Sequence, residues 1–243
     1  MKKYYYDLHL HSCLSPCGDE DNTPNNIVGM AKLCGLDIIA LTDHNSAKNC
    51  PAFFEAAERM NIIPVAGMEL TTSEDIHVIC LFEHLKDALA YDEYLDGKRI
   101  KIKNRPEIFG HQTILDGQDN PVGEISDLLI NATSISISDV RDSVESFGGV
   151  CYPAHIDRDA NGIISVLGTL PTDYTFGIYE LNDGSTIEEY SNKYNIGKDR
   201  FIISSDAHYL TDMRDNESCF ELTCESDHAS VRAQLFKLLR RLH

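Results

Sequence analysis

The sequence has no tryptophan and no apolar run near the roughly 20 residues that a membrane-spanning helix needs. It also lacks the apolar core of a signal peptide, because Asp7, His9 and His11 interrupt the stretch after Lys3. Basic residues are scarce: 21 Lys and Arg stand against 39 Asp and Glu, giving a formal net charge of −18. These absences predict a cytoplasmic protein without a membrane segment.

The acidic balance makes long nucleic acids poor partners, because proteins that bind DNA through its phosphates present basic surfaces. The most basic stretch, residues 98–105, is interpreted as a solvated loop or edge strand. A small anionic substrate is compatible with this charge if bound cations reverse the local field. Solubility explains the net charge equally well.

Eight cysteines could pair, but without an export signal we expect reduced thiols. Cys34, Cys80 and Cys151 lie in apolar contexts and are predicted to be buried. Cys13 and Cys17, which closely follow two histidines, are the pair that suggests a further role.

The 243 residues, of which 42% are hydrophobic, are enough for a single domain with a substantial core. Strands are predicted at residues 4–9, 37–42, 62–66 (broken early at Pro64), 76–82, 149–153, 177–181 and 201–204. Helices are predicted at residues 24–34, 51–60, 85–95, 138–147, after the capping box 185–188, and at 229–242. Alternating strands and helices predict a parallel α/β sheet or barrel. Residues 96–122 have weak periodicity and are expected to form an insertion or lid.

Histidines and carboxylates recur at the ends of these strands. His9 and His11 form a His-x-His whose alternate positions face one side of a strand. The other members are Asp43 and His44, Glu69, His77, His155, and Asp206 and His208. Catalytic residues gather at the carboxyl ends of the strands in parallel α/β folds. Imidazole and carboxylate ligands without a thiolate cluster suit zinc, manganese or iron in hydrolytic sites.

Such a ligand set has a chemical use. Two or three divalent cations about 3.5–4 Å apart bind phosphoryl oxygens, acidify a bridging water and stabilise the leaving oxygen. Glu69 is a natural bridge, because its two oxygens can bind two cations. His84, His111, His228 and His243 do not follow the pattern and are interpreted as hydrogen-bonded structural residues.

Six stretches occur in the order found in one known family: Asp7-Leu8-His9-Leu10-His11-Ser12, Leu41-Thr42-Asp43-His44-Asn45, Gly67-Met68-Glu69, Ile76-His77-Val78, Pro153-Ala154-His155 and Ser205-Asp206-Ala207-His208. Together they resemble the polymerase-and-histidinol-phosphatase (PHP) superfamily. The resemblance implies a single-domain distorted (β/α)7 TIM-like barrel that hydrolyses phosphate esters at a two- or three-metal site.

Carried over, the resemblance implies three ligand sets. The first is His9, His11, Glu69 and Asp206, the second is Glu69, His77 and His155, and the third is His44 and His208. Asp43 would hold a ligand in place or handle a proton. Many three-metal members have another histidine soon after the His-x-His, whereas this chain has Ser15-Pro16-Cys17-Gly18-Asp19. The third site is therefore either completed by Cys17 or Asp19 or not formed.

The fifth motif usually reads Ala-His-Pro, but here Ile156-Asp157-Arg158 follows His155. Arg158 could present a fork of donors to a substrate phosphate, or form a surface ion pair with Asp157 or Asp159. The sequence thus predicts a metal-dependent phosphoesterase acting on a small phosphorylated substrate. The alternatives are a histidinol-phosphate phosphatase, a nuclease on short oligonucleotides, and a metal-binding regulatory domain without turnover.

Overall fold

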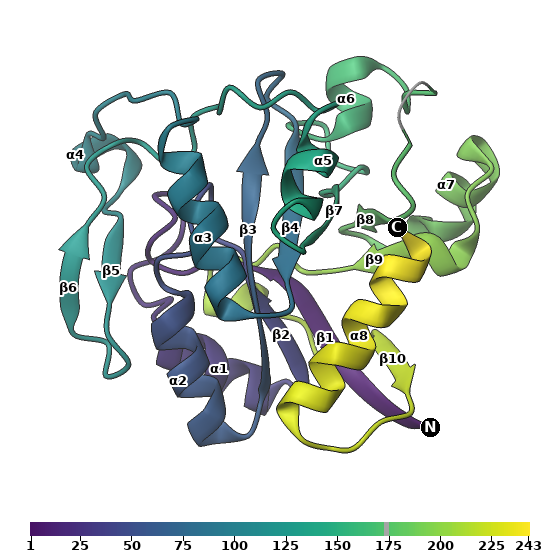
Figure 1. Cartoon of the computed structure of the whole chain (residues 1–243), viewed down its shortest axis with the longest axis horizontal. Coiled ribbons are helices and arrows are strands. Elements are labelled where there is room, and N and C mark those ends of the chain that lie inside the picture. Colours follow the sequence, from purple (N-terminus) through teal and green to yellow (C-terminus); the bar gives the residue numbers. More distant parts are fainter. Residues whose placement is uncertain (173–174) are drawn as a thin grey trace.

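The computed structural model describes residues 1–172 and 175–243. Its strands are β1 (Lys2–Leu10), β2 (Ile38–Leu41), β3 (Ile63–Thr71), β4 (His77–Phe82), β5 (Thr113–Leu115), β6 (Pro121–Glu124), β7 (Val150–Pro153), β8 (Tyr179–Leu181), β9 (Phe201–Ile203) and β10 (Cys219–Leu222). Its α-helices are α1 (Pro24–Leu33), α2 (Cys50–Met60), α3 (Leu85–Asp96), α4 (Pro106–Phe109), α5 (Val140–Glu145), α6 (Ile163–Leu167), α7 (Ile187–Tyr194) and α8 (His228–Leu242) (Figure 1).

The strands enclose one interior. The main sheet has the order β10-β1-β2-β3-β4-β7, and β8 pairs with β9. Two backbone hydrogen bonds close the circle: Ile156, after β7, donates to Glu180 of β8 (2.9 Å), and His11, after β1, donates to Ala207 after β9 (3.0 Å). The strands β1, β2, β3, β4, β7, β8 and β9 therefore form the predicted distorted seven-stranded barrel, and β10 adds to the outside of β1.

The expectation of parallel strands is wrong at β4. Strands β1, β2 and β3 are parallel, but β4 is antiparallel to both of its neighbours, β3 and β7 (Figure 1). The cause is a tight connection after β3, in which Thr72 donates its N–H to Ile76 (2.9 Å). Only antiparallel strands can be joined by so short a turn. As a result, His77 at the start of β4 lies at the same end of the barrel as the end of β3.

The predicted break at Pro64 is also wrong, because β3 continues through it to Thr71. Ile63 donates its N–H to Asp37 beside β2 (2.8 Å), so by alternation the nitrogen of Pro64 points to the other side. There the ladder with β4 begins only at Ala66. The missing N–H of proline thus removes no ladder bond.

Two apolar clusters lie on the two faces of the sheet. One, here called the helix-side cluster, packs alternate strand residues such as Leu41 and Met68 against α1, α2, α3 and α5. The other, called the α8 cluster, packs Leu8, Val65, Ile79 and other strand residues against the buried face of α8. Side chains alternate along a strand, so Glu69, four residues after Val65, shares a face with the α8 cluster. The ligand candidates and α8 therefore occupy the same side of the sheet.

Several local predictions are corrected in detail. The capping box at 185–188 does not cap α7; instead the Asp183 side chain accepts from the Ser185 N–H and opens a short 3₁₀ turn before the helix. Cys34 is half-buried rather than buried, and all eight cysteines are free thiols. The role of residues 96–122 as an insertion or lid stays a prediction; they contain α4, β5 and the start of β6, and the N–H of Leu115 bonds to the Asn49 side chain (2.9 Å).

Candidate metal centre

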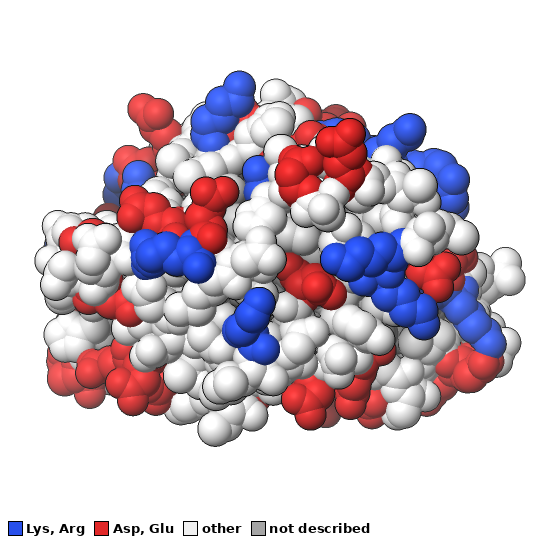
Figure 2. Space-filling view, turned by 90° about the horizontal axis from the view of Figure 1, so that it is seen from below, with Lys and Arg blue, Asp and Glu red and all other residues white. Residues whose placement is uncertain are grey.

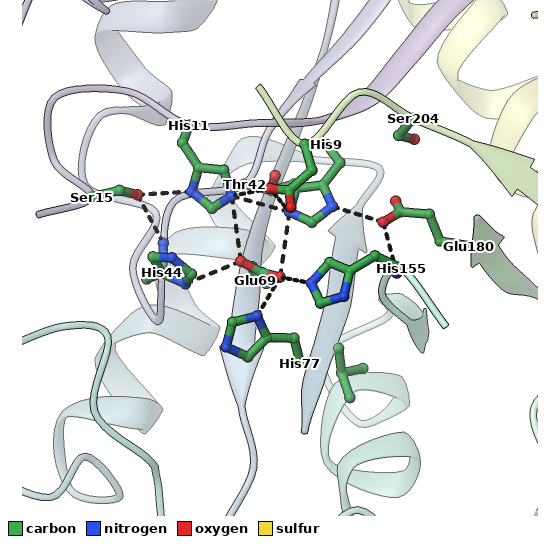
Figure 3. Close-up of polar contacts among 12 residues, drawn as sticks. His9, His11, Ser15, Thr42, His44, Glu69, His77, His155, Glu180 and Ser204 are labelled. Atoms are coloured by element: carbon green, nitrogen blue, oxygen red, sulfur yellow. Dashed lines mark hydrogen bonds and ion pairs between the residues drawn. The ribbon is translucent and has the colours of Figure 1, made fainter. Parts of the chain in front are cut away.

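Glu69 lies at the centre of the buried ligand cluster (Figure 3). One carboxylate oxygen, Oε1, lies 2.8 Å from His77 Nδ1, 3.0 Å from His155 Nε2 and 3.4 Å from His9 Nε2. The other, Oε2, lies 3.0 Å from His44 Nδ1 and 3.3 Å from His11 Nε2. A carboxylate whose two oxygens face different sets of imidazoles has the arrangement expected of a bridge between cations.

A β-bulge aims the His-x-His at this carboxylate. Asp7 and Leu10 of β1 pair with Ile39 and Leu41 of β2, so β1 has one extra residue between the two pairs. Leu10 consequently packs in the helix-side cluster, and His9 and His11 on either side of it face the barrel interior. Bulges commonly redirect side chains in this way at functional sites. Without the extra residue, the alternation from Leu8 would turn His9 outward.

Three groups of side chains converge closely enough to hold a cation. They are His9, His11, Glu69 and Asp206; His44, Glu69 and His77; and His11, His44 and His208. The first group equals the first predicted ligand set. The second group contains His44 where the predicted set has His155; His155 lies 3.0 Å from Glu69 but outside the group. In the third, His11 joins the predicted His44 and His208.

The geometry fits cations. Glu69 Oε2, Asp206 Oδ1 and His44 Nδ1 are buried and make no hydrogen bond, although charged or polar atoms lie within 3.5 Å of each. His9 Nε2 and His11 Nε2 approach to 3.0 Å, where only one proton can lie between them. Buried polar atoms without hydrogen bonds are costly, and divalent cations would satisfy them. The donor set of imidazoles and carboxylates suits zinc, manganese or iron.

The pKa values divide the imidazoles into two kinds. Burial alone would lower the pKa of His11, but Asp206 and Glu69 outweigh it and raise the pKa to about 9. Burial lowers the pKa of His44 to about 4 and that of His208 to about 3. His44 and His208 are therefore neutral and ready to bind a cation, whereas His11 must exchange a proton for one.

Residues behind the ligands fix their orientation, and sequence reasoning missed two of them. Glu180 accepts from His9 Nδ1 (2.8 Å) and from the His155 N–H (3.1 Å). Ser15 Oγ contacts His11 Nδ1 (2.9 Å) and accepts from the His44 N–H (3.2 Å) (Figure 3). The signal for Glu180 was its place as the single charge in the predicted strand 177–181. Partners of this kind set the tautomer and direction of a metal-binding imidazole.

Asp43 lies behind Ser15 and away from the cavity. Its carboxylate accepts from the Ser12 N–H (2.7 Å), the Ser12 hydroxyl (2.6 Å) and the Ser15 hydroxyl (2.7 Å). Burial raises the pKa of Asp43, although these donors oppose the shift. Of the two predicted roles, the contacts favour holding a ligand in place over handling a proton.

Arg158 lies at the mouth of the cluster. Its guanidinium is 2.5 Å from Asp206 Oδ2, so the predicted surface pair with Asp157 or Asp159 is not what the structure shows. Asp157 instead accepts from the N–H groups of Asn182 (2.9 Å) and Asp183 (2.8 Å). A cavity of about 160 Å³ lies here, lined by His44, Glu69, His77, His155, Arg158, Ala160, Asn161, Asp206 and His208.

The other candidates lie outside these groups. Neither Cys17 nor Asp19 belongs to any close ligand group in the described part of the chain. Cys17 is exposed as a residue, but desolvation of its thiol and nearby carboxylates raise the pKa of that thiol to about 12, which disfavours the thiolate in the metal-free state. His84, His111, His228 and His243 are likewise absent from the groups found among the described residues.

The backbone is strained at the site. Asp206 (φ 54°), His155 (φ 27°) and Asn45 (φ 49°) all have positive φ, which residues other than glycine rarely adopt. Each residue is a ligand candidate or follows one directly. Strain of this kind persists where surrounding contacts impose it, and it clusters at functional sites.

Comparison with protein families and known sequences shows which family this chain belongs to. Residues 7–194 match the family model described as the PHP domain. The chain belongs to the PHP domain family. It is 28% identical over 99 residues to an uncharacterized protein of Methanocaldococcus jannaschii, covering 37% of this chain and 58% of that protein. Over 75 residues it is 35% identical to the PolC-type DNA polymerase III of Thermotoga maritima, covering 30% of this chain and 5% of the polymerase. The matches thus span less than two thirds of these relatives.

Solved structures share the fold of this PHP protein. The lesion-specific endonuclease PfuEndoQ from Pyrococcus furiosus has a TM-score of 0.66 at 15% identity, covering 100% of this chain and 57% of that chain. A candidate metal-dependent phosphoesterase from Bifidobacterium adolescentis has a TM-score of 0.59 at 19% identity, covering 96% of each chain. Family membership and the buried His/Glu/Asp clusters are together consistent with a site for more than one divalent cation.

Proposed function

We propose that this PHP protein hydrolyses a small phosphorylated substrate with two or three divalent cations held by the buried cluster. The observation that carries the proposal is the position of Glu69, whose two oxygens face two different sets of imidazoles. Bound there, the cations would polarise a phosphoryl oxygen and acidify a water molecule.

Each cation would be held by a different set of ligand residues. His9, His11 and Asp206 would hold one cation with Glu69, and His77 and His155, which face Glu69 Oε1, would hold a second with it. His44 would also contribute to the cation held by Glu69 and His77, and with His208 it would contribute to a third. Glu69 is the residue on which the sites depend, because removing its charge removes the shared ligand.

Arg158 would bind the substrate phosphate. Its side chain is 42% exposed at the cavity, and only part of its donor fork is used by Asp206. A guanidinium offers five N–H donors in a plane, so it can hold Asp206 and a phosphate oxygen together. This places a fixed positive charge beside the cations in a chain of net charge −18.

A small substrate fits the surface better than a long polyanion. The basic stretch 98–105 is largely paired with acids: Arg99 with Asp92, Lys101 with Asp96 and Lys103 with Asp127. On the face seen in Figure 2, basic side chains lie beside acidic ones. Charges neutralised in this way contribute little to binding a nucleic-acid backbone. In the described residues, no helix is long and apolar enough to cross a membrane.

A substrate panel tests the proposal. Phosphomonoesters including histidinol phosphate, a small phosphodiester and single-stranded DNA are each assayed with Mn, Zn and Mg. Small esters should be hydrolysed faster than DNA, and Glu69→Gln should lose at least about 100-fold in rate. Glu188→Gln, an exposed carboxylate on α7, is the matched control and should keep full activity.

Each other outcome supports one alternative. Faster cleavage of DNA would indicate a nuclease, and turnover of histidinol phosphate alone would indicate histidinol-phosphate phosphatase. Metal binding without turnover of any substrate would indicate a regulatory domain. Unchanged activity in Glu69→Gln would contradict the shared-ligand mechanism.

A further inference from the structure

The loop that carries His44 is bound by a half-buried arginine, Arg99. Arg99 donates to the backbone oxygen of Asn45 twice, from Nε (2.9 Å) and from Nη2 (2.6 Å). The same Nη2 lies 2.7 Å from Asp92 Oδ1. Because Asn45 directly follows His44, these bonds act one residue away from a proposed ligand.

Asp92 is an unusual residue for its position. It lies in α3, a helix that packs on β3 and β4, yet only 1% of its surface is exposed. Its Oδ1 also accepts from the Ala47 N–H (3.0 Å), and its Oδ2 pairs with Lys48 Nζ (3.0 Å). A buried carboxylate is costly unless it is paired. Two of these partners, Ala47 and Lys48, belong to the loop after β2, and the third, Arg99, binds the same loop at Asn45. The Asp92 carboxylate therefore holds this loop in place.

Asn45 needs this support because its backbone is strained, with φ 49°. Its side chain accepts from the Thr71 N–H (2.9 Å) and donates to the oxygens of Leu129 (2.7 Å) and Asn131 (2.9 Å). Its own N–H bonds to the Glu69 backbone oxygen (2.9 Å). These hydrogen bonds fix the position of the loop that carries His44. In this position His44 Nδ1 lies 3.0 Å from Glu69 Oε2.

We propose that Arg99 and Asp92 are positioning residues that hold His44 where it can bind a cation with Glu69. This inference rests on the proposed metal sites but concerns two residues that do not line the substrate cavity. His44 belongs to two of the three close ligand groups. Loss of the pair should therefore weaken cation binding at the two groups that contain His44 and leave the group of His9, His11, Glu69 and Asp206 intact.

The test compares Arg99→Lys, Arg99→Ala and the control Arg105→Ala, an exposed arginine on the same segment. Lysine can keep the ion pair with Asp92 but cannot supply the forked donation to Asn45, so Arg99→Lys should fold. The readout is metal content and the affinity for Mn or Zn of chelator-stripped protein, measured by calorimetry. We expect both Arg99 variants to bind cations at the groups that contain His44 about 10–100-fold less tightly, with the binding at the remaining group unchanged.

Two further arms separate positioning from a general loss of structure. Guanidinium ion, added far below denaturing concentrations, should restore metal binding in Arg99→Ala but not in His44→Ala. Wild-type affinity for every cation in both Arg99 variants would overturn the inference. A loss spread equally over all cations would also overturn it. A wild type that binds metal but hydrolyses no ester would instead refute the proposed function, because this test reads binding alone.

Discussion

The same strands build two different regions on one face of the sheet. Towards α8, Val65 of β3 and Ile79 of β4 lie in the α8 cluster with Phe236, and the region is apolar. A few residues along, the same strands present Glu69 and His77, and the region is polar and buried. The comparison shows that the apolar residues that stabilise the fold and the ligand candidates occupy different positions along the same strands. They are not carried by different strands. Barrel enzymes commonly divide their two ends in this way.

The largest expected effect is a loss of stability caused by a substitution in the apolar region alone. Phe236→Ala removes a side chain that is 0% exposed between α8 and the strands. Such truncations cost about 3–5 kcal/mol through lost burial and the cavity that remains. The free energy of unfolding should fall by this amount in urea titrations. Metal content below the transition should equal that of the wild type, and a loss of metal in the folded variant would contradict the separation of the two regions.

A smaller effect should arise from the boundary of the polar region. Glu180→Gln keeps the shape of the side chain but removes the negative charge beside His9 Nδ1. Removing such partners costs about 10–100-fold in metal affinity or activity, and the retained amide oxygen favours the lower figure. Metal affinity and rate should fall together, whereas Glu188→Gln should change neither. Equal behaviour of the two variants would show that Glu180 does not orient His9.

Much of this arrangement was predictable from the sequence. The ligand candidates were found because chemically distinctive residues recur at strand ends, and α8 was found from its apolar periodicity. The direction of β4 was not predictable from its residues, because an apolar run is equally suited to either direction and the turn at Thr72 decides it. The bulge before Leu10 and the inclusion of Pro64 in a continuous β3 were not predictable either. Both depend on pairing with strand residues distant in the sequence. Glu180 and Arg99 act through hydrogen bonds to residues distant in the sequence, which no sequence motif records.

The central claim is that one buried cluster holds at least two cations through a shared Glu69. The most direct measurement is the metal content per chain, by plasma mass spectrometry, of wild type and Glu69→Gln purified without chelators. The account predicts two or three divalent cations in the wild type and a lower number in Glu69→Gln. Fewer than two cations in the wild type, or an equal number in the variant, would contradict it.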